Sequence, residues 1–224
     1  MNHADTPEQW RQPFPESEVP FILSAVLRCA SVLKKQEDCE HENYVTIRLA
    51  KLLLRDAVML ARPVQLDLEV WEIDRIKPEV LGRLDLRYIY STGISHPWPC
   101  FAIEAKRLHV TFPKGGWKSL VSEYVTGDTE KPDEEEQGMM CFVTGRYSGG
   151  LRAGAMVGYV YDADVGRASN GVFDAITKHA RKLKLSTSHQ ITVSDIIPNE
   201  SRISESIHHL AGGTFTIYHV LFSV

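Results

Sequence analysis

The chain has 224 residues and a net charge of −4, with 43% hydrophobic and 24% charged residues. These are the proportions of an ordinary globular protein, and the length suits one domain of moderate size. The acidic balance argues against a protein that coats nucleic acid through a uniformly basic surface.

Two helices are predicted in the first sixty or so residues, at 17–35 and 42–60. Apolar residues recur there at intervals of three and four, which is the period of an amphipathic helix. They are Val19, Ile22, Leu23, Val26, Leu27 and Ala30 in the first helix, and Val45, Leu49, Leu52, Leu53 and Ala57 in the second. Pro63 is expected to end the second helix, because proline disfavours helix in the residue before it.

Three strands are predicted next. Residues 64–73 alternate apolar and polar side chains, which is typical of a half-buried strand. A connection that contains Pro78 leads to a strand around Asp85, and a loop rich in glycine and proline separates it from a strand at 100–108. Strands that follow one another through loops predict an antiparallel meander.

The remaining elements are shorter or more widely spaced. Helices are predicted at 117–125, 134–146 and 170–183, with strands at 155–161 and 214–224. The acidic segment 130–136 contains Pro132 and is predicted to be an exposed loop. We find no internal repeat and no boundary between two domains, so a single domain over 1–224 is expected.

The strand at 100–108 carries charge inside an otherwise apolar run. Glu104 and Lys106 are two residues apart and therefore share one face of the strand. Burying ionised groups is costly unless they pair, form hydrogen bonds or bind metal. An edge strand with ordinary solvated charges, or with a weak pair on its outer face, is the simpler interpretation. If the strand of Asp85 lies alongside, two carboxylates and one ammonium group converge.

This order of elements, with Asp85 on the second strand and Glu104-Ala105-Lys106 on the third, resembles the PD-(D/E)xK nuclease superfamily of restriction endonucleases and related DNA-processing enzymes. The resemblance implies an α/β (α+β) fold with a central mixed sheet flanked by helices and a restriction endonuclease-like core. It covers residues 42–162. Residues 1–41 are then a helical N-terminal extension, and 163–224 supply a helix and a strand that complete the fold.

The resemblance also implies roles for individual residues. Asp85 takes the place of the motif aspartate, Glu104 of the second acid and Lys106 of the lysine, while Leu84 stands where the pattern has proline. Glu42 matches an acid that some members carry on the first core helix, and Gln137 a polar residue on the helix after the third strand. Favourable placement at a helix start is an alternative explanation for Glu42, and simple exposure is one for Gln137.

The chemistry of these side chains agrees with such a role. Hard carboxylate oxygens suit Mg²⁺ or Mn²⁺, so Asp85 and Glu104 are expected to be metal ligands, joined by the carbonyl of Ala105 as the resemblance implies. Hydrolysis of a phosphodiester needs the phosphoryl charge neutralised and a water activated. Lys106 would contact that water or the phosphate.

Basic residues follow the motif and are candidates for nucleic-acid binding. They are Arg107, Lys114 and Lys118. A solvated surface is the more common explanation for such a basic run.

Partners and location are expectations of the same kind. No apolar run approaches the length of a membrane helix, and 1–15 lack the core of a signal peptide, so we expect a cytoplasmic protein without a membrane partner. Cys29, Cys39, Cys100 and Cys141 form no Cys-x-x-Cys pair, which favours reduced thiols over structural zinc.

Two functional classes are open at this point. The first is a Mg²⁺- or Mn²⁺-dependent endonuclease or exonuclease that acts on DNA in restriction, repair or phage defence. It would work beside a protein partner that selects the target, or as a homodimer. The alternative is a non-catalytic nucleic-acid-binding or protein-interaction module with a degenerate nuclease fold.

Overall fold

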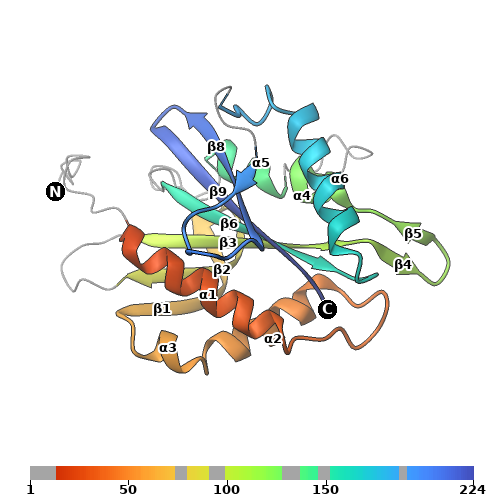
Figure 1. The fold of residues 1–224 in the computed structure, drawn as a ribbon, viewed down its shortest axis with the longest axis horizontal. Coiled ribbons are helices and arrows are strands. Elements are labelled where there is room, and N and C mark those ends of the chain that lie inside the picture. The colour runs from red at the N-terminus through yellow and green to blue at the C-terminus, as the bar shows by residue number, and fades with distance from the viewer. Residues whose placement is uncertain (1–13, 74–79, 91–98, 128–136, 146–151, 187–190) are drawn as a thin grey trace.

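The computed structural model describes residues 14–73, 80–90, 99–127, 137–145, 152–186 and 191–224. A seven-stranded sheet forms the middle of the molecule, in the spatial order β1-β2-β3-β6-β9-β8-β7 (Figure 1). Its strands are β1 (Val64–Ile73), β2 (Val80–Tyr90), β3 (Cys100–Leu108), β6 (Ala153–Val160), β7 (Thr192–Val193), β8 (Ile203–Leu210) and β9 (Gly213–Ser223). Helices flank the sheet, so the predicted α/β class with a mixed sheet is confirmed.

The sheet combines two kinds of pairing. β1, β2 and β3 pair antiparallel, as the meander prediction expects. β3, β6 and β9 pair parallel in the centre, and β8 and β7 return antiparallel at the far edge. Central parallel strands are covered on both faces, and β6 is accordingly buried along almost its whole length.

The helices divide between the two faces. α1 (Val19–Ala30), α2 (Glu42–Leu53) and the short α3 (Ala57–Leu60) lie on one side, whereas α4 (Val121–Val125), α5 (Met139–Val143) and α6 (Val165–Lys178) lie on the other (Figure 1). Alternate residues of each strand enter the two cores. In β3, Ile103 enters the core beneath α1 and α2, and Ala102 the opposite core.

The N-terminal helix belongs to the main core. Ile22, Leu23 and Val26 of α1 are fully buried in the cluster that contains Ile103. The helix is shorter than the predicted 17–35 at both ends. A turn of 3-10 helix, Glu16–Glu18, precedes it, and it ends at Ala30 with Ser31 as its C-cap. Residues 14–41 are therefore part of the same folded unit rather than an appendage.

Two of the predicted helices begin or end differently because of local caps. The predicted helix 42–60 is interrupted at Asp56, whose carboxylate accepts hydrogen bonds from the N–H groups of Val58 and Met59 and begins α3. α6 begins at Val165, earlier than predicted, because Asp164 accepts the N–H of Arg167.

The segment after β3 contains a hairpin that the sequence analysis missed. β4 (Val110–Phe112) and β5 (Gly116–Lys118) pair antiparallel, so only the end of the predicted helix 117–125 is helical, as α4. Leu120 separates the strand from the helix with a positive φ of 55°. The predicted helix at 134–146 is represented by α5, and the acidic segment 130–136 lies outside the described residues.

The strand β8 was also missed. Its sequence, Ile-Ser-Glu-Ser-Ile-His-His-Leu, is rich in polar residues and lacks the apolar alternation of the other strands. It pairs with β9 along its whole length. The C-terminal part of the chain therefore supplies one helix and three strands, where one helix and one strand were expected.

Candidate functional site

The candidate site lies where β2 and β3 separate. Their ladder ends at the pair Leu86 and Ile103, so Asp85 and Glu104 come next and stand opposite each other on one face. Beyond that pair, the Oδ2 atom of Asp85 accepts a hydrogen bond from the N–H of Ala105 at 2.8 Å. A side-chain carboxylate thus replaces the backbone carbonyl that a continued ladder would supply.

Helix α2 supplies the next carboxylate. Glu42, its first residue, accepts the N–H of Arg107 on Oε2 at 3.3 Å and lies 3.3 Å from Lys106 Nζ through Oε1. The N–H groups of Ala105 and Arg107 at this edge of β3 are therefore both bound by carboxylates. Lys106 Nζ also contacts Glu104 Oε1 at 2.7 Å, as expected for residues two apart on one strand face.

The cluster is buried and carries an excess of negative charge. Glu104 is 3% exposed, Lys106 6% and Asp85 9%, and the side chain of Glu42 is largely covered. Three carboxylates share the ammonium group of Lys106, so two negative charges stay uncompensated within the cluster if all four groups are ionised. Buried charges without partners are costly, which makes this a place where a divalent cation would be stabilised.

The pKa values of Asp85 and Lys106 are shifted because these groups are buried close to other charged side chains. Burial, followed by the charge of Glu104, raises the pKa of Asp85 to about 8, despite the opposing effect of Lys106. Burial by itself would lower the pKa of Lys106, but Glu104, Glu42 and Asp85 together hold it well above the usual value. Lys106 is therefore cationic at neutral pH. Perturbed groups that face one another in this way are typical of functional sites.

The carboxylate oxygens of Asp85 and Glu104 suit Mg²⁺ better than a metal ion whose ligands must all come from the protein. Among the described residues, no group of three or more His, Cys, Asp or Glu side chains is arranged to hold a metal ion. Mg²⁺ keeps several waters and commonly uses one or two carboxylates, which Asp85 and Glu104 can provide. The N–H and C=O of one strand residue point to the same side, so the carbonyl of Ala105 faces the same opening as its N–H.

The other predicted residues lie outside this cluster. Gln137 precedes α5 rather than lying on a helix, and no hydrogen bond joins it to the cluster within the part of the chain that the structure describes. The Arg107 guanidinium donates to the carbonyls of Cys39 and Glu40, so it holds that loop against β3. Lys114 and Lys118 are exposed on the β4–β5 hairpin.

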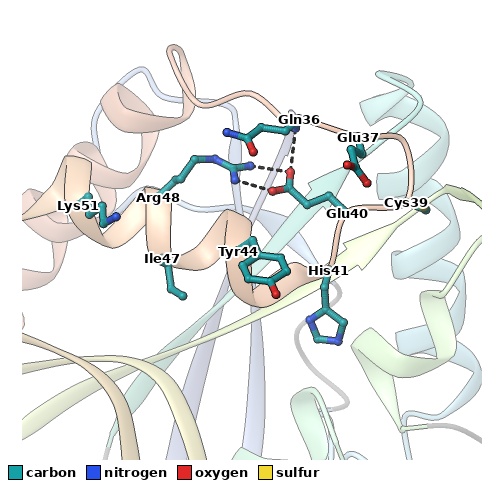
Figure 2. A pocket seen from close by; sticks show the side chains of 9 residues that line it. All are labelled: Gln36, Glu37, Cys39, Glu40, His41, Tyr44, Ile47, Arg48 and Lys51. Atoms are coloured by element: carbon teal, nitrogen blue, oxygen red, sulfur yellow. Dashed lines mark hydrogen bonds and ion pairs between the residues drawn. The ribbon is translucent and has the colours of Figure 1, made fainter.

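A pocket beside the start of α2 is separate from the cluster. It has a volume of about 530 Å³ and lies beside the first turns of α2, where Arg48 forms an ion pair with Glu40 in its wall (Figure 2). Neither Asp85, Glu104 nor Lys106 lines it. We therefore place the candidate site at the carboxylate cluster, where the charges converge, and not in this pocket.

A second set of buried polar residues forms a hydrogen-bond network around Ser206. His219 and His208 each lie 2.8 Å from the hydroxyl of Ser206, and His208 Nδ1 lies 2.8 Å from the carbonyl of Leu183. Tyr124 completes the chain at 3.1 Å from His219 Nδ1. The Leu183 carbonyl can only accept, so with both imidazoles neutral Ser206 donates to His208 and His219 donates to Ser206, which leaves His219 Nδ1 as an acceptor. The single hydrogen of the Tyr124 hydroxyl then faces two acceptors, His219 Nδ1 and the carbonyl of Met156 at 3.2 Å.

The two histidines of this network, His208 and His219, are satisfied core residues. Burial lowers the pKa of His219 to about 3, with a further contribution from His208. Burial also lowers the pKa of His208. Both imidazoles are neutral at pH 7, and neither contacts the carboxylate cluster in the described part of the chain.

Acid is expected to destabilise the protein through His219. An unfolded histidine takes up a proton below about pH 6.5 and the buried one does not, so the contribution of His219 to the free energy of unfolding should fall by about 1.4 kcal/mol per pH unit between pH 6.5 and about 3. Urea unfolding of wild type and His219→Gln across this range measures this contribution as the difference between their slopes. The exposed His209→Gln should keep the wild-type slope; equal slopes for wild type and His219→Gln would contradict the assignment.

Comparisons with known proteins do not place the chain in a family. No family model, curated protein or solved structure matches it. In the described residues, no helix combines the length and apolar character needed to cross a membrane.

Proposed function

We propose that this protein is a metal-dependent nuclease that hydrolyses phosphodiester bonds in DNA, built on a restriction endonuclease-like core. The observation that carries the proposal is the convergence of Asp85, Glu104, Lys106 and Glu42 at the point where β2 and β3 separate. Residues more than sixty positions apart meet there in a buried cluster with excess negative charge. A purely structural ion pair would not need the additional acids.

Asp85 and Glu104, with the carbonyl of Ala105, would hold Mg²⁺ or Mn²⁺. The bound ion would neutralise charge on the phosphoryl group and lower the pKa of a water. Glu42 fixes the position of Lys106 by accepting from its ammonium group while binding the backbone of Arg107. A carboxylate that bridges helix and strand in this way keeps the lysine aligned when substrate enters.

Lys106 supplies the positive charge of the site. Its ammonium group touches Glu104 and Glu42, so it lies beside the ligands and can stabilise a hydroxide or the charge that develops on the scissile phosphate. Because its pKa is held high, Lys106 acts through its charge and hydrogen bonds rather than as a general base at neutral pH.

The biological setting is proposed on more general grounds. A chain of this size with a net charge of −4 has little surface for choosing a DNA target by itself. We propose that it acts in the cytoplasm, in restriction, repair or phage defence, beside a protein partner or as a homodimer in which two sites cut two strands.

Glu104→Gln is expected to reduce DNA cleavage at least about a hundredfold, because it removes a charged metal ligand with little change in shape. Supercoiled plasmid incubated with Mg²⁺ or Mn²⁺, with EDTA as the blank, measures the rate. Glu37→Gln, an exposed acid on the loop before α2, is the matched control and should cut like wild type. Cleavage in EDTA, or unchanged cleavage by folded Glu104→Gln, would refute the proposal.

A further inference from the structure

The β4–β5 hairpin extends β3 beyond the candidate site. β3 ends at Leu108 and β4 begins at Val110, and the hairpin projects from the body of the molecule (Figure 1). His109 turns the chain between the two strands with a φ of 57°. The strand that contains Glu104 and Lys106 therefore leads directly into the β4–β5 hairpin.

Trp117 is the large aromatic residue of the hairpin that faces solvent. It lies opposite Thr111 and is 48% exposed. The guanidinium of Arg167, from the first turn of α6, lies 4.9 Å from the centre of its ring, and the ring of His109 lies 5.2 Å away at an angle of 54°. Two side chains thus hold the indole in one orientation while about half of its surface stays accessible.

A single carboxylate holds both of these supporting side chains. Asp162 accepts from Arg167 and lies 3.0 Å from His109 Nδ1. Burial by itself would raise the pKa of Asp162. Hydrogen bonds from the N–H of Asp164 and from Arg167 and His109 have the larger effect, so the pKa of Asp162 is lowered. Asp162 is therefore anionic at neutral pH, and Trp117 is preorganised before any ligand arrives. Preorganisation reduces the entropy lost on binding.

The hairpin also has the charge to attract a nucleic acid. Residues 110–118 contain Lys114 and Lys118 and no acidic residue, in a chain whose net charge is −4. Both lysines are exposed, and Lys118 Nζ lies 5.9 Å from the centre of the Phe112 ring. An exposed aromatic ring between lysines is the arrangement that binds single strands, in which bases stack on the ring and cations contact phosphates.

We propose that Trp117 is a stacking platform for an unpaired nucleobase, so that the preferred substrate carries a single-stranded segment or a frayed end. Bases inside an intact duplex have both faces covered by their neighbours, whereas an unpaired base has an exposed face on which the indole ring can stack. The inference rests on the proposed nuclease function, because it defines which DNA the site at Glu104 and Lys106 receives.

Binding measured in EDTA, where cleavage is blocked, tests this inference. The probes are a fluorescently labelled single strand of about 20 nucleotides and the blunt duplex of the same sequence. Wild type should bind the single strand at least about tenfold more tightly, and Trp117→Ala should lose about tenfold of that affinity, whereas Trp117→Phe should stay within about threefold. Phe21→Ala is the matched control, since Phe21 is a partly exposed ring stacked on Arg62, away from the hairpin.

The outcomes separate this inference from the proposed function. Wild-type affinity in folded Trp117→Ala, or equal affinity of wild type for both probes, would overturn the stacking platform even if plasmid is cut. Trp117-dependent binding of single strands by a protein that never cuts DNA would support the platform and refute the nuclease.

Discussion

Replacing Lys106 by methionine is expected to lower the free energy of unfolding at pH 7 by about 3–5 kcal/mol and to abolish metal-dependent cleavage. Methionine keeps most of the apolar stem, so the variant removes mainly the charge. Glu104, Glu42 and Asp85 would then share a buried space without the ammonium group that now contacts Glu104 and Glu42. Breaking a buried ion pair costs more than forming it gains, because the remaining charges stay desolvated.

Urea unfolding at pH 7 and pH 5 measures this effect. Without Lys106, the remaining carboxylates should take up protons at higher pH, so the deficit should shrink as the pH falls from 7 to 5. Lys51→Met, at an exposed position of α2, should change stability by no more than about 0.5 kcal/mol. A Lys106→Met protein as stable as wild type at pH 7, or one that cuts DNA normally, would contradict the central role of this ammonium group.

Replacing Asp85 by asparagine is expected to stabilise the metal-free protein at pH 8 while abolishing cleavage. The pKa of Asp85 is raised to about 8 in the folded state, so the unfolded chain releases this proton near pH 4 and the folded chain holds it. The contribution of Asp85 to wild-type stability should therefore fall as the pH rises from about 4 to about 8 and then level off, opposite in sign to the contribution of His219 below pH 6.5. Asparagine keeps an oxygen for the N–H of Ala105 and has no charge to bury, so a gain on the order of 2–5 kcal/mol is expected at pH 8.

Thermal unfolding at pH 5 and pH 8, with and without Mg²⁺, checks the prediction. Mg²⁺ should raise the Tm of wild type at pH 8, since a ligand that binds only the folded state stabilises it, and should leave Asp85→Asn unchanged. Asp174→Asn, on the exposed side of α6, should behave as wild type. A variant less stable than wild type at pH 8 would show that the Asp85 carboxylate is held by stronger contacts than its hydrogen bond to Ala105.

Sequence reasoning located the strands that carry the candidate site because their patterns are local. The alternation of β1 and the apolar run of β3 predicted Val64–Ile73 and Cys100–Leu108 with the bounds that the structure has. A period of two also placed Glu104 and Lys106 on one face, and their side chains lie 2.7 Å apart. By contrast, β8 escaped prediction, since its inward-facing Ser206 and His208 satisfy each other in a buried network rather than by being apolar.

The sequence by itself determined that the chain combines helices and strands, the order of the first three strands and the pairing of an acid with a lysine on β3, because periodicity and spacing act between near neighbours. The tertiary structure alone decided that β2 and β3 separate at Asp85, that Glu42 reaches across from α2 to Lys106, and that Asp162 holds Arg167 against Trp117. Those contacts join residues far apart along the chain or depend on where a ladder ends. They follow from how the layers pack, which no local pattern records.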